Sequence, residues 1–118
     1  MQHRMRITDT SVDKFHAISH MVGQWQDMDV LAVDTSWIAR VMGVTKPTAL
    51  RHLETMRVLG YLERIVTPYR KNAVQYKWKL TPDARKKYHQ GYFANYFNHV
   101  KSQMLHVAKM KGNKRFTI

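Results

Sequence analysis

Residues 45–64 read TKPTALRHLETMRVLGYLER, and this pattern predicts a helix of about four turns. Thr45 is expected to cap the helix and Pro47 to lie in its first turn, where the missing N–H of proline costs nothing. Apolar side chains recur at three- and four-residue steps and are expected to face inward: Ala49, Leu50, Leu53, Met56 and Leu59. The outward positions carry basic, histidine and hydroxyl side chains and no acid: Lys46, Thr48, Arg51, His52 and Thr55.

Another helix is predicted directly before this one, in DTSWIARVMGV at 34–44. Asp34 or Thr35 can cap it. Its buried face is expected to hold Ile38, Ala39 and Met42. Gly43 stands where the chain must turn, a position that favours positive φ. Two helices joined by a glycine-containing turn of about three residues have the layout of a helix-turn-helix.

The spacing of apolar residues changes from helical to alternating after Gly60. YLERIV at 61–66 and VQYKWKL at 74–80 are therefore predicted strands. Between them, TPYRKNA at 67–73 contains a proline, an asparagine and two cations, which is typical of a turn. The three segments together predict a β-hairpin with a basic tip.

A further helix is expected on each side of this block. Residues 11–26 repeat apolar side chains along one stripe: Val12, Phe15, Ile18, Val22 and Trp25. Downstream, Thr81 and Pro82 are expected to open a helix that runs from 83 to 110 unless Gly91 divides it. The predicted fold class is thus mainly α with a small β-hairpin.

Positive charge is concentrated after residue 34. The chain of 118 residues has a net charge of +12. Residues 1–34 hold three basic residues and five aspartates, whereas residues 35–118 hold 17 basic residues and three acids. This asymmetry favours a polyanionic partner, which can be nucleic acid, an anionic membrane or an acidic protein.

Signals for catalysis, metal binding and membrane insertion are weak. The chain has no cysteine, and no Walker loop, dinucleotide-binding glycine motif or nucleophile elbow is found. His16 and His20 have a spacing that can hold a metal, but no third ligand follows at a useful distance. The aliphatic run VLAV at 30–33 is far shorter than the ~18 residues of a membrane span. We therefore expect a cytoplasmic protein that is not an enzyme and uses neither a metal nor a cofactor.

Two stretches carry a family resemblance: SWIARVMGVTKPTALRHLETMRVLGYLER at 36–64 and KLTPDARKKY at 79–88. They resemble the winged helix-turn-helix of bacterial and phage transcription regulators, in particular the MarR-like group. The first is similar to the scaffold helix, turn and recognition helix of that family, and the second to the start of its dimerisation helices. Residue 84 is alanine where the family often has glycine, and the hairpin tip lacks the Asp-x-Arg pattern common in the family.

The resemblance implies a homodimeric transcription regulator, most simply a repressor, that binds a palindromic site in double-stranded DNA and associates with the nucleoid. Its parts would be a leader at 1–10, a DNA-binding domain at 11–82, one or more dimerisation helices at 83–110 and a basic tail at 111–118. Helix 46–59 would enter the major groove, where Arg51 is the best candidate for a bidentate contact with guanine. Whether a small-molecule effector exists stays open.

The candidate site residues fall into four groups. The recognition helix would contact DNA through Thr45, Lys46, Pro47, Thr48, Arg51, His52 and Thr55. The wing would contribute Tyr69, Arg70, Lys71, Asn72 and Lys77. Contacts to the DNA backbone are expected from Thr35, Ser36, Arg40 and Arg57. An aromatic and apolar stripe would form the dimer interface: Tyr88, Tyr92, Phe93, Tyr96, Phe97, Val100 and Met104.

Each pattern has a competing interpretation. The outward face of helix 46–59 and the hairpin tip could be ordinary solvated surface. The aromatic stripe could stack single-stranded bases instead of packing between helices. At the level of function, the competing hypotheses are a phage or plasmid replication or partition protein, and a winged-helix module that docks on polymerase or another regulator.

Overall fold

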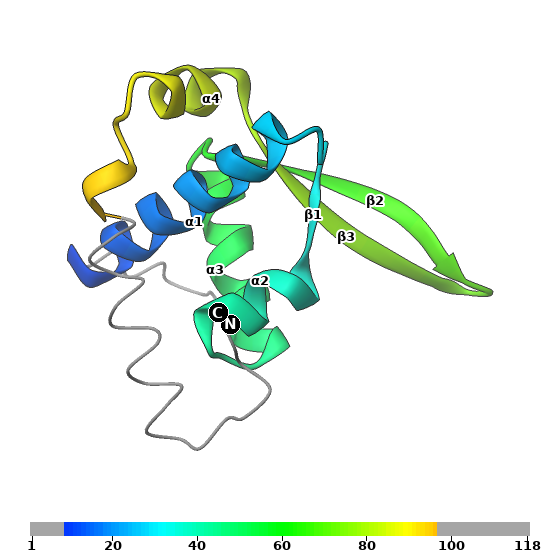
Figure 1. Ribbon diagram of the computed structural model, residues 1–118. Coiled ribbons are helices and arrows are strands. Elements are labelled where there is room, and N and C mark those ends of the chain that lie inside the picture. Colours follow the sequence, from blue (N-terminus) through cyan, green and yellow to red (C-terminus); the bar gives the residue numbers. More distant parts are fainter. Residues whose placement is uncertain (1–8, 97–118) are drawn as a thin grey trace.

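The computed structural model describes residues 9–96 and shows a mixed fold of helices and an antiparallel sheet (Figure 1). Its elements are α1 (Asp9–Asp27), β1 (Val33–Asp34), α2 (Thr35–Met42), α3 (Lys46–Val58), β2 (Leu62–Arg70), β3 (Ala73–Leu80) and α4 (Pro82–His89). The predicted order of helices and hairpin is confirmed, and a short third strand joins the hairpin. Residues 1–8, the predicted tail at 111–118 and the predicted interface residues Phe97, Val100 and Met104 lie outside the described residues.

An apolar core lies between α1, α2, α3 and the base of the hairpin. The stripe predicted on α1 is buried at Phe15, Ile18 and Val22, which are at most 2% exposed. Burying such a side chain fully stabilises a fold by roughly 1.5–3 kcal/mol. The other elements complete the core with Ile38, Met42, Leu53, Met56, Leu62, Trp78 and Leu80.

The turn between α2 and α3 has the local chemistry that the sequence predicted. Asp34 caps α2, because its carboxylate accepts the backbone N–H of Trp37 at 2.7 Å. Gly43 adopts φ 69° and closes the end of α2 with its own N–H. Thr45 then caps α3 with its hydroxyl. These local interactions fix where α3 begins and which of its faces turns outward.

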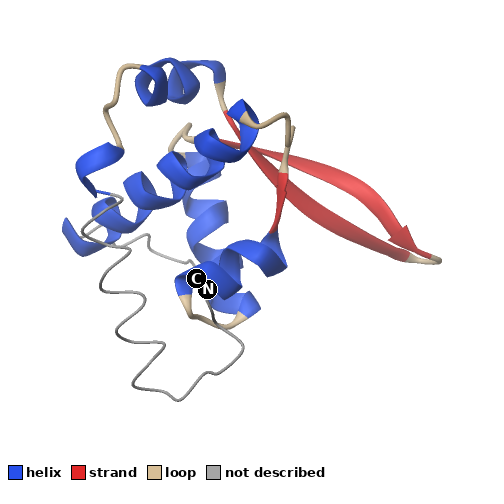
Figure 2. Cartoon of the chain, in the orientation of Figure 1, coloured by secondary structure: helices blue, strands red, loops and turns tan. Residues whose placement is uncertain are grey.

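The hairpin is a long antiparallel pair that projects beyond the helices (Figure 2). At its base Arg64 pairs with Trp78, and β1 adds an edge by pairing Val33 with Trp78. Further out on the hairpin, Val66 and Val74 are 52% and 60% exposed. The orientation of the outer half is therefore determined by the packing of its base.

α4 packs on the C-terminal end of α1 and ends at His89. The carboxylate of Asp27 accepts a hydrogen bond from Arg85 at 3.2 Å and lies 3.0 Å from Nε2 of His89. Gly91 then has φ 78°, so the helix expected over 83–110 is interrupted there. Among residues 9–96, no helix has the length and apolar character needed to cross a bilayer.

Candidate nucleic-acid interface

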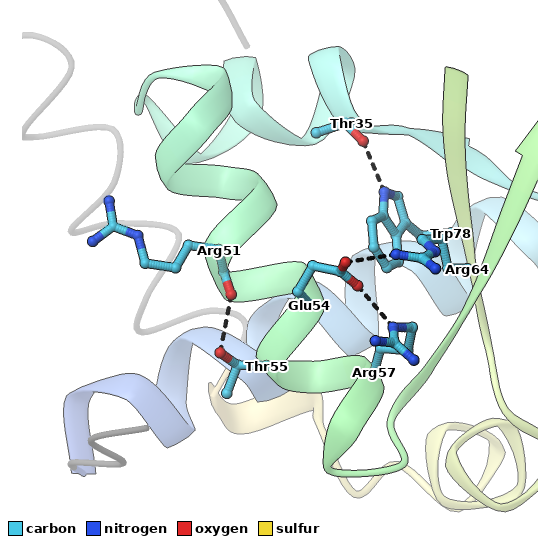
Figure 3. A network of polar contacts seen from close by, with 7 residues as sticks. All are labelled: Thr35, Arg51, Glu54, Thr55, Arg57, Arg64 and Trp78. Carbon is cyan, nitrogen blue, oxygen red and sulfur yellow. Dashed lines mark hydrogen bonds and ion pairs between the residues drawn. The ribbon is translucent and has the colours of Figure 1, made fainter. Parts of the chain in front are cut away.

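The first two turns of α3 present a basic surface to solvent. Thr45, Lys46 and Pro47 are exposed, and Thr48 is half-buried. Arg51 is exposed and extends from the side of α3 opposite Glu54 (Figure 3). No ion pair within residues 9–96 engages its guanidinium. An exposed helix edge with an unengaged guanidinium has the shape and donors that a major groove about 12 Å wide accepts.

Two further residues of the predicted face lie closer to the body of the protein. The half-buried ring of His52 meets Phe15 edge-on, with 6.2 Å between centroids. Burial lowers the pKa of His52, and the nearby charges of Lys14 and Arg51 lower it further, so the neutral imidazole is favoured. The hydroxyl of Thr55 donates to the Arg51 carbonyl at 3.0 Å, so its hydrogen is already used within α3.

Arg57, predicted to contact the DNA backbone, is paired with Glu54 on its own helix. The Nε–H of Arg57 donates to Oε1 of Glu54 at 2.7 Å, and Arg64 donates to Oε2 at 2.6 Å (Figure 3). The guanidinium of Arg64 lies 4.8 Å from the centre of the Tyr76 ring. Sequence reasoning missed Arg64. The available signal was its position two residues after the inward-facing Leu62 in a strand, which places both side chains on one face.

Thr35, another predicted backbone contact, belongs to the interior. It is 4% exposed, and its hydroxyl accepts the indole N–H of Trp78 at 2.8 Å and donates to the Tyr76 carbonyl at 3.2 Å. This hydroxyl joins β3 to the start of α2 and has no capacity left for a phosphate. Ser36 and Arg40, predicted for the same role, are exposed.

A groove of about 190 Å³ separates the start of α3 from the hairpin. Its lining combines one cation with hydroxyl, amide, aromatic and aliphatic groups: Thr35, Ser36, Lys46, Leu50, Tyr69, Val74, Gln75 and Tyr76. The sequence prediction placed these groups on three separate segments. The structure brings the beginnings of α2 and α3 together with the outer part of the hairpin.

The tip of the hairpin is exposed at each of its predicted contact residues: Tyr69, Arg70, Lys71 and Asn72. Asn72 has φ 63°, a left-handed conformation that asparagine tolerates in tight turns. The guanidinium of Arg70 lies 5.1 Å from the centre of the Tyr69 ring. Lys77 is half-buried and alternates with Trp78, so it lies on the opposite face of the sheet from that core residue.

The aromatic stripe predicted for a dimer interface divides at Gly91. Before it, Tyr88 packs on α1 so closely that a Cβ added at Gly23 would lie 2.6 Å from the tyrosine ring. After it, Phe93 is 2% exposed and is buried within the chain itself. Tyr92 and Tyr96 remain partly exposed.

The two histidines with metal-like spacing, His16 and His20, pack against tyrosine rings. Among residues 9–96, no three histidine, cysteine or acidic side chains gather closely enough to hold a metal ion. His16 is 4% exposed, and its Nε2 lies 3.2 Å from the Tyr61 hydroxyl. Burial lowers the pKa of both His16 and His20.

No family model matches the chain, and no curated protein matches it. The interpretation of the basic surface therefore depends on its geometry and chemistry.

Proposed function

We propose that this protein is a sequence-specific regulator of transcription that binds double-stranded DNA through a MarR-like winged helix-turn-helix and acts as a repressor by occluding a promoter. The observation that carries the proposal is that Lys46 of α3 and Tyr69 of the hairpin line one groove. A helix and a basic hairpin on either side of one groove can engage neighbouring parts of the same duplex. α3 would enter the major groove, and the hairpin tip would follow the phosphates or enter the minor groove.

The exposed cations divide between two roles in this proposal. Arg51 reads base edges, because a guanidinium can donate two parallel hydrogen bonds to guanine. Lys46, Arg70 and Lys71 neutralise phosphates and so position the protein without carrying sequence information. Each neutralised phosphate releases counterions, so the affinity for DNA should fall steeply as salt is raised.

The proposed assembly is a twofold homodimer formed through residues 83–110. The exposed Tyr92 and Tyr96 support it, because large aromatic side chains left in solvent are typical of association surfaces. Such a dimer would place two copies of α3 about 34 Å apart, which matches a palindromic site with half-sites one DNA turn apart. A protein with this role would work in the cytoplasm, on the nucleoid.

The experiment that tests this function is the selection of bound duplexes from a random library by the full chain, at a low and a physiological salt concentration. The expected result is a palindromic motif whose binding weakens as salt is raised. Recovery of random sequences at both salt concentrations would contradict sequence-specific binding.

One observation favours a second candidate function, a module that docks on polymerase or another regulator. Val66 and Val74 are exposed apolar residues on the hairpin, and Val74 also lines the groove. Apolar side chains contribute little to binding a phosphate backbone but are common in protein interfaces. A docking module would show partner binding without salt-sensitive affinity for duplex DNA.

A further inference from the structure

Glu54 connects the helix proposed to read DNA with the hairpin proposed to hold it. Its two carboxylate oxygens accept from different elements, Oε1 from Arg57 of α3 and Oε2 from Arg64 of β2 (Figure 3). The side chains of Glu54 and Arg64 are 34% and 30% exposed. The ion pair is thus partly screened from solvent, where a charge-assisted hydrogen bond is stronger than on an open surface.

Arg64 lies where the hairpin leaves the body of the protein. It pairs with Trp78, which is completely buried, and its guanidinium covers the ring of Tyr76 in the adjacent strand. Two residue pairs further out, Val66 is already more than half exposed. The bond between Glu54 and Arg64 therefore ties the middle of α3 to the last well-packed part of the hairpin.

Because the hairpin is long, a small rotation at its base near Arg64 causes a large displacement of its tip. The six steps along the strand from Arg64 to Arg70 span about 20 Å at about 3.3 Å per residue. A rotation of about 10° at the base would move the tip by roughly 3.5 Å over that length, which exceeds the tolerance of a hydrogen bond to a phosphate. The angle between α3 and the hairpin must therefore be set at the base if both are to fit one duplex.

Glu54 also restrains two cations. Residues 35–118 contain only three acids, Glu54, Glu63 and Asp83, against 17 basic residues. A carboxylate that binds Arg57 and Arg64 keeps both guanidiniums from contacting phosphates when the protein lies at a non-specific position on DNA. We propose that Glu54 is a positioning residue for DNA recognition: it fixes the hairpin relative to α3 and withholds two cations, and so raises discrimination between a specific duplex and random DNA. This inference rests on the proposed DNA-binding function.

Glu63 provides a matched control for charge. It lies on β2 and its carboxylate is 3.9 Å from Nζ of Lys79, so its ion pair stays within the hairpin. Glu54→Ala and Glu63→Ala each remove one negative charge and one ion-pairing acid from the same region. Only the first removes an ion pair between α3 and the hairpin.

The experiment measures the affinity of wild type, Glu54→Ala and Glu63→Ala for the selected duplex and for a random duplex across a salt series. Glu63→Ala is expected to raise both affinities by the same factor, because it removes one negative charge and releases Lys79 but leaves the ion pair between α3 and the hairpin in place. Glu54→Ala is expected to raise affinity for random DNA and to steepen the salt dependence by up to about 2 in logarithmic slope, because two guanidiniums are released. Its ratio of specific to random affinity is expected to fall about tenfold, which corresponds to one lost or misplaced base contact.

The ratio separates positioning from stability. If Glu54→Ala merely unfolded part of the sample, both affinities would fall by one factor and the ratio would stay unchanged. An unchanged ratio, or a ratio that falls equally in Glu54→Ala and Glu63→Ala, would overturn the inference while leaving the DNA-binding function intact. If wild type itself does not distinguish the two duplexes, the proposed function fails and the inference with it.

Discussion

Trp78 of β3 and Thr35 of α2 are joined by a buried hydrogen bond. The indole N–H donates to the threonine hydroxyl at 2.8 Å, and the two residues are 0% and 4% exposed. The residues are 43 positions apart, so this bond fixes the start of the helix-turn-helix against the sheet. A buried indole N–H has no water to replace a lost partner, and for that reason the bond matters more than an exposed one would.

Thr35→Val should lower the free energy of unfolding by about 1–3 kcal/mol, because the shape is kept while the Trp78 N–H loses its acceptor. Urea denaturation monitored by tryptophan fluorescence measures the change. Thr35→Ser is the control, since it keeps the hydroxyl and removes one methyl group, at a cost of about 0.8 kcal/mol. A valine variant as stable as wild type would show that the hydrogen bond contributes nothing.

Gly23 and Tyr88 form a tight contact between α1 and α4 that reverses the usual effect of glycine in a helix. Gly23→Ala would normally stabilise a helix interior by roughly 0.5–1 kcal/mol. Here the new Cβ would lie 2.6 Å from Cγ of Tyr88, so we expect a loss of about 1–3 kcal/mol from overpacking. In a Tyr88→Ala background the same substitution should stabilise. Thermal unfolding of the four proteins in this double-mutant cycle tests the sign change, and a loss of the same size in both backgrounds would contradict it.

His16 should make the fold less stable in mild acid. Its ring packs against Tyr61 and Phe93, and burial lowers its pKa, with Asp13 acting in the opposite direction and Lys87 in the same direction. Because the unfolded state then binds the proton more readily, stability is complete above the unfolded pKa of about 6.5 and is lost as the pH falls through the lower folded value. The pKa values of His20 and His52 are lowered by burial as well, so their contributions have the same sign.

His16→Phe keeps a planar ring and removes the titrating group. The decline in unfolding free energy between pH 7.5 and 5, measured by urea denaturation, should therefore be smaller than in wild type. A decline of the wild-type size in this variant would assign the pH dependence to other groups.

The parts of the fold that the sequence predicted correctly depend on residues that are close together in the chain. Asp34, Gly43 and Thr45 each act on residues within a turn of the chain, so the caps and the turn of the helix-turn-helix were readable. The alternation in 74–80 likewise predicted a strand whose alternate residues Trp78 and Leu80 reach the core. Exposure of Lys46 and Arg51 followed from the helical period alone.

The features that the sequence did not predict depend on contacts between residues that are distant in the chain. The partner of Thr35 is 43 residues away, and the second partner of Glu54 is ten residues away on a strand, so no local pattern indicated that these groups were already engaged. The aromatic stripe was predicted as one continuous face. The positive φ of Gly91 breaks the helix there, and Phe93 lies in the core while Tyr92 is 51% exposed.

Substitution of Phe93 should therefore affect mainly the stability of the fold, and substitution of Tyr92 mainly dimerisation. Phe93→Ala is expected to cost about 3–5 kcal/mol of stability, as for other buried phenylalanines. The double variant Tyr92→Ser, Tyr96→Ser should cost less stability than Phe93→Ala, because both tyrosines are partly exposed although their rings contact His16. It should shift the full chain from dimer to monomer in sedimentation equilibrium. Undiminished dimerisation of that variant would remove these tyrosines from the interface.

Arg51 and Arg70 should differ in what their loss does to DNA binding. Arg51→Ala should reduce the ratio of specific to random affinity by about 10- to 100-fold, because a bidentate base contact discriminates by about 1–3 kcal/mol. Arg70→Ala should weaken binding to both duplexes by one factor and reduce the salt slope by about 1, because it removes one phosphate contact. Lys86→Ala is the charge-matched control, since Lys86 is exposed on α4, away from the groove. If all three variants lost affinity for both duplexes equally, only net charge would matter, and neither α3 nor the hairpin tip would be the reading surface.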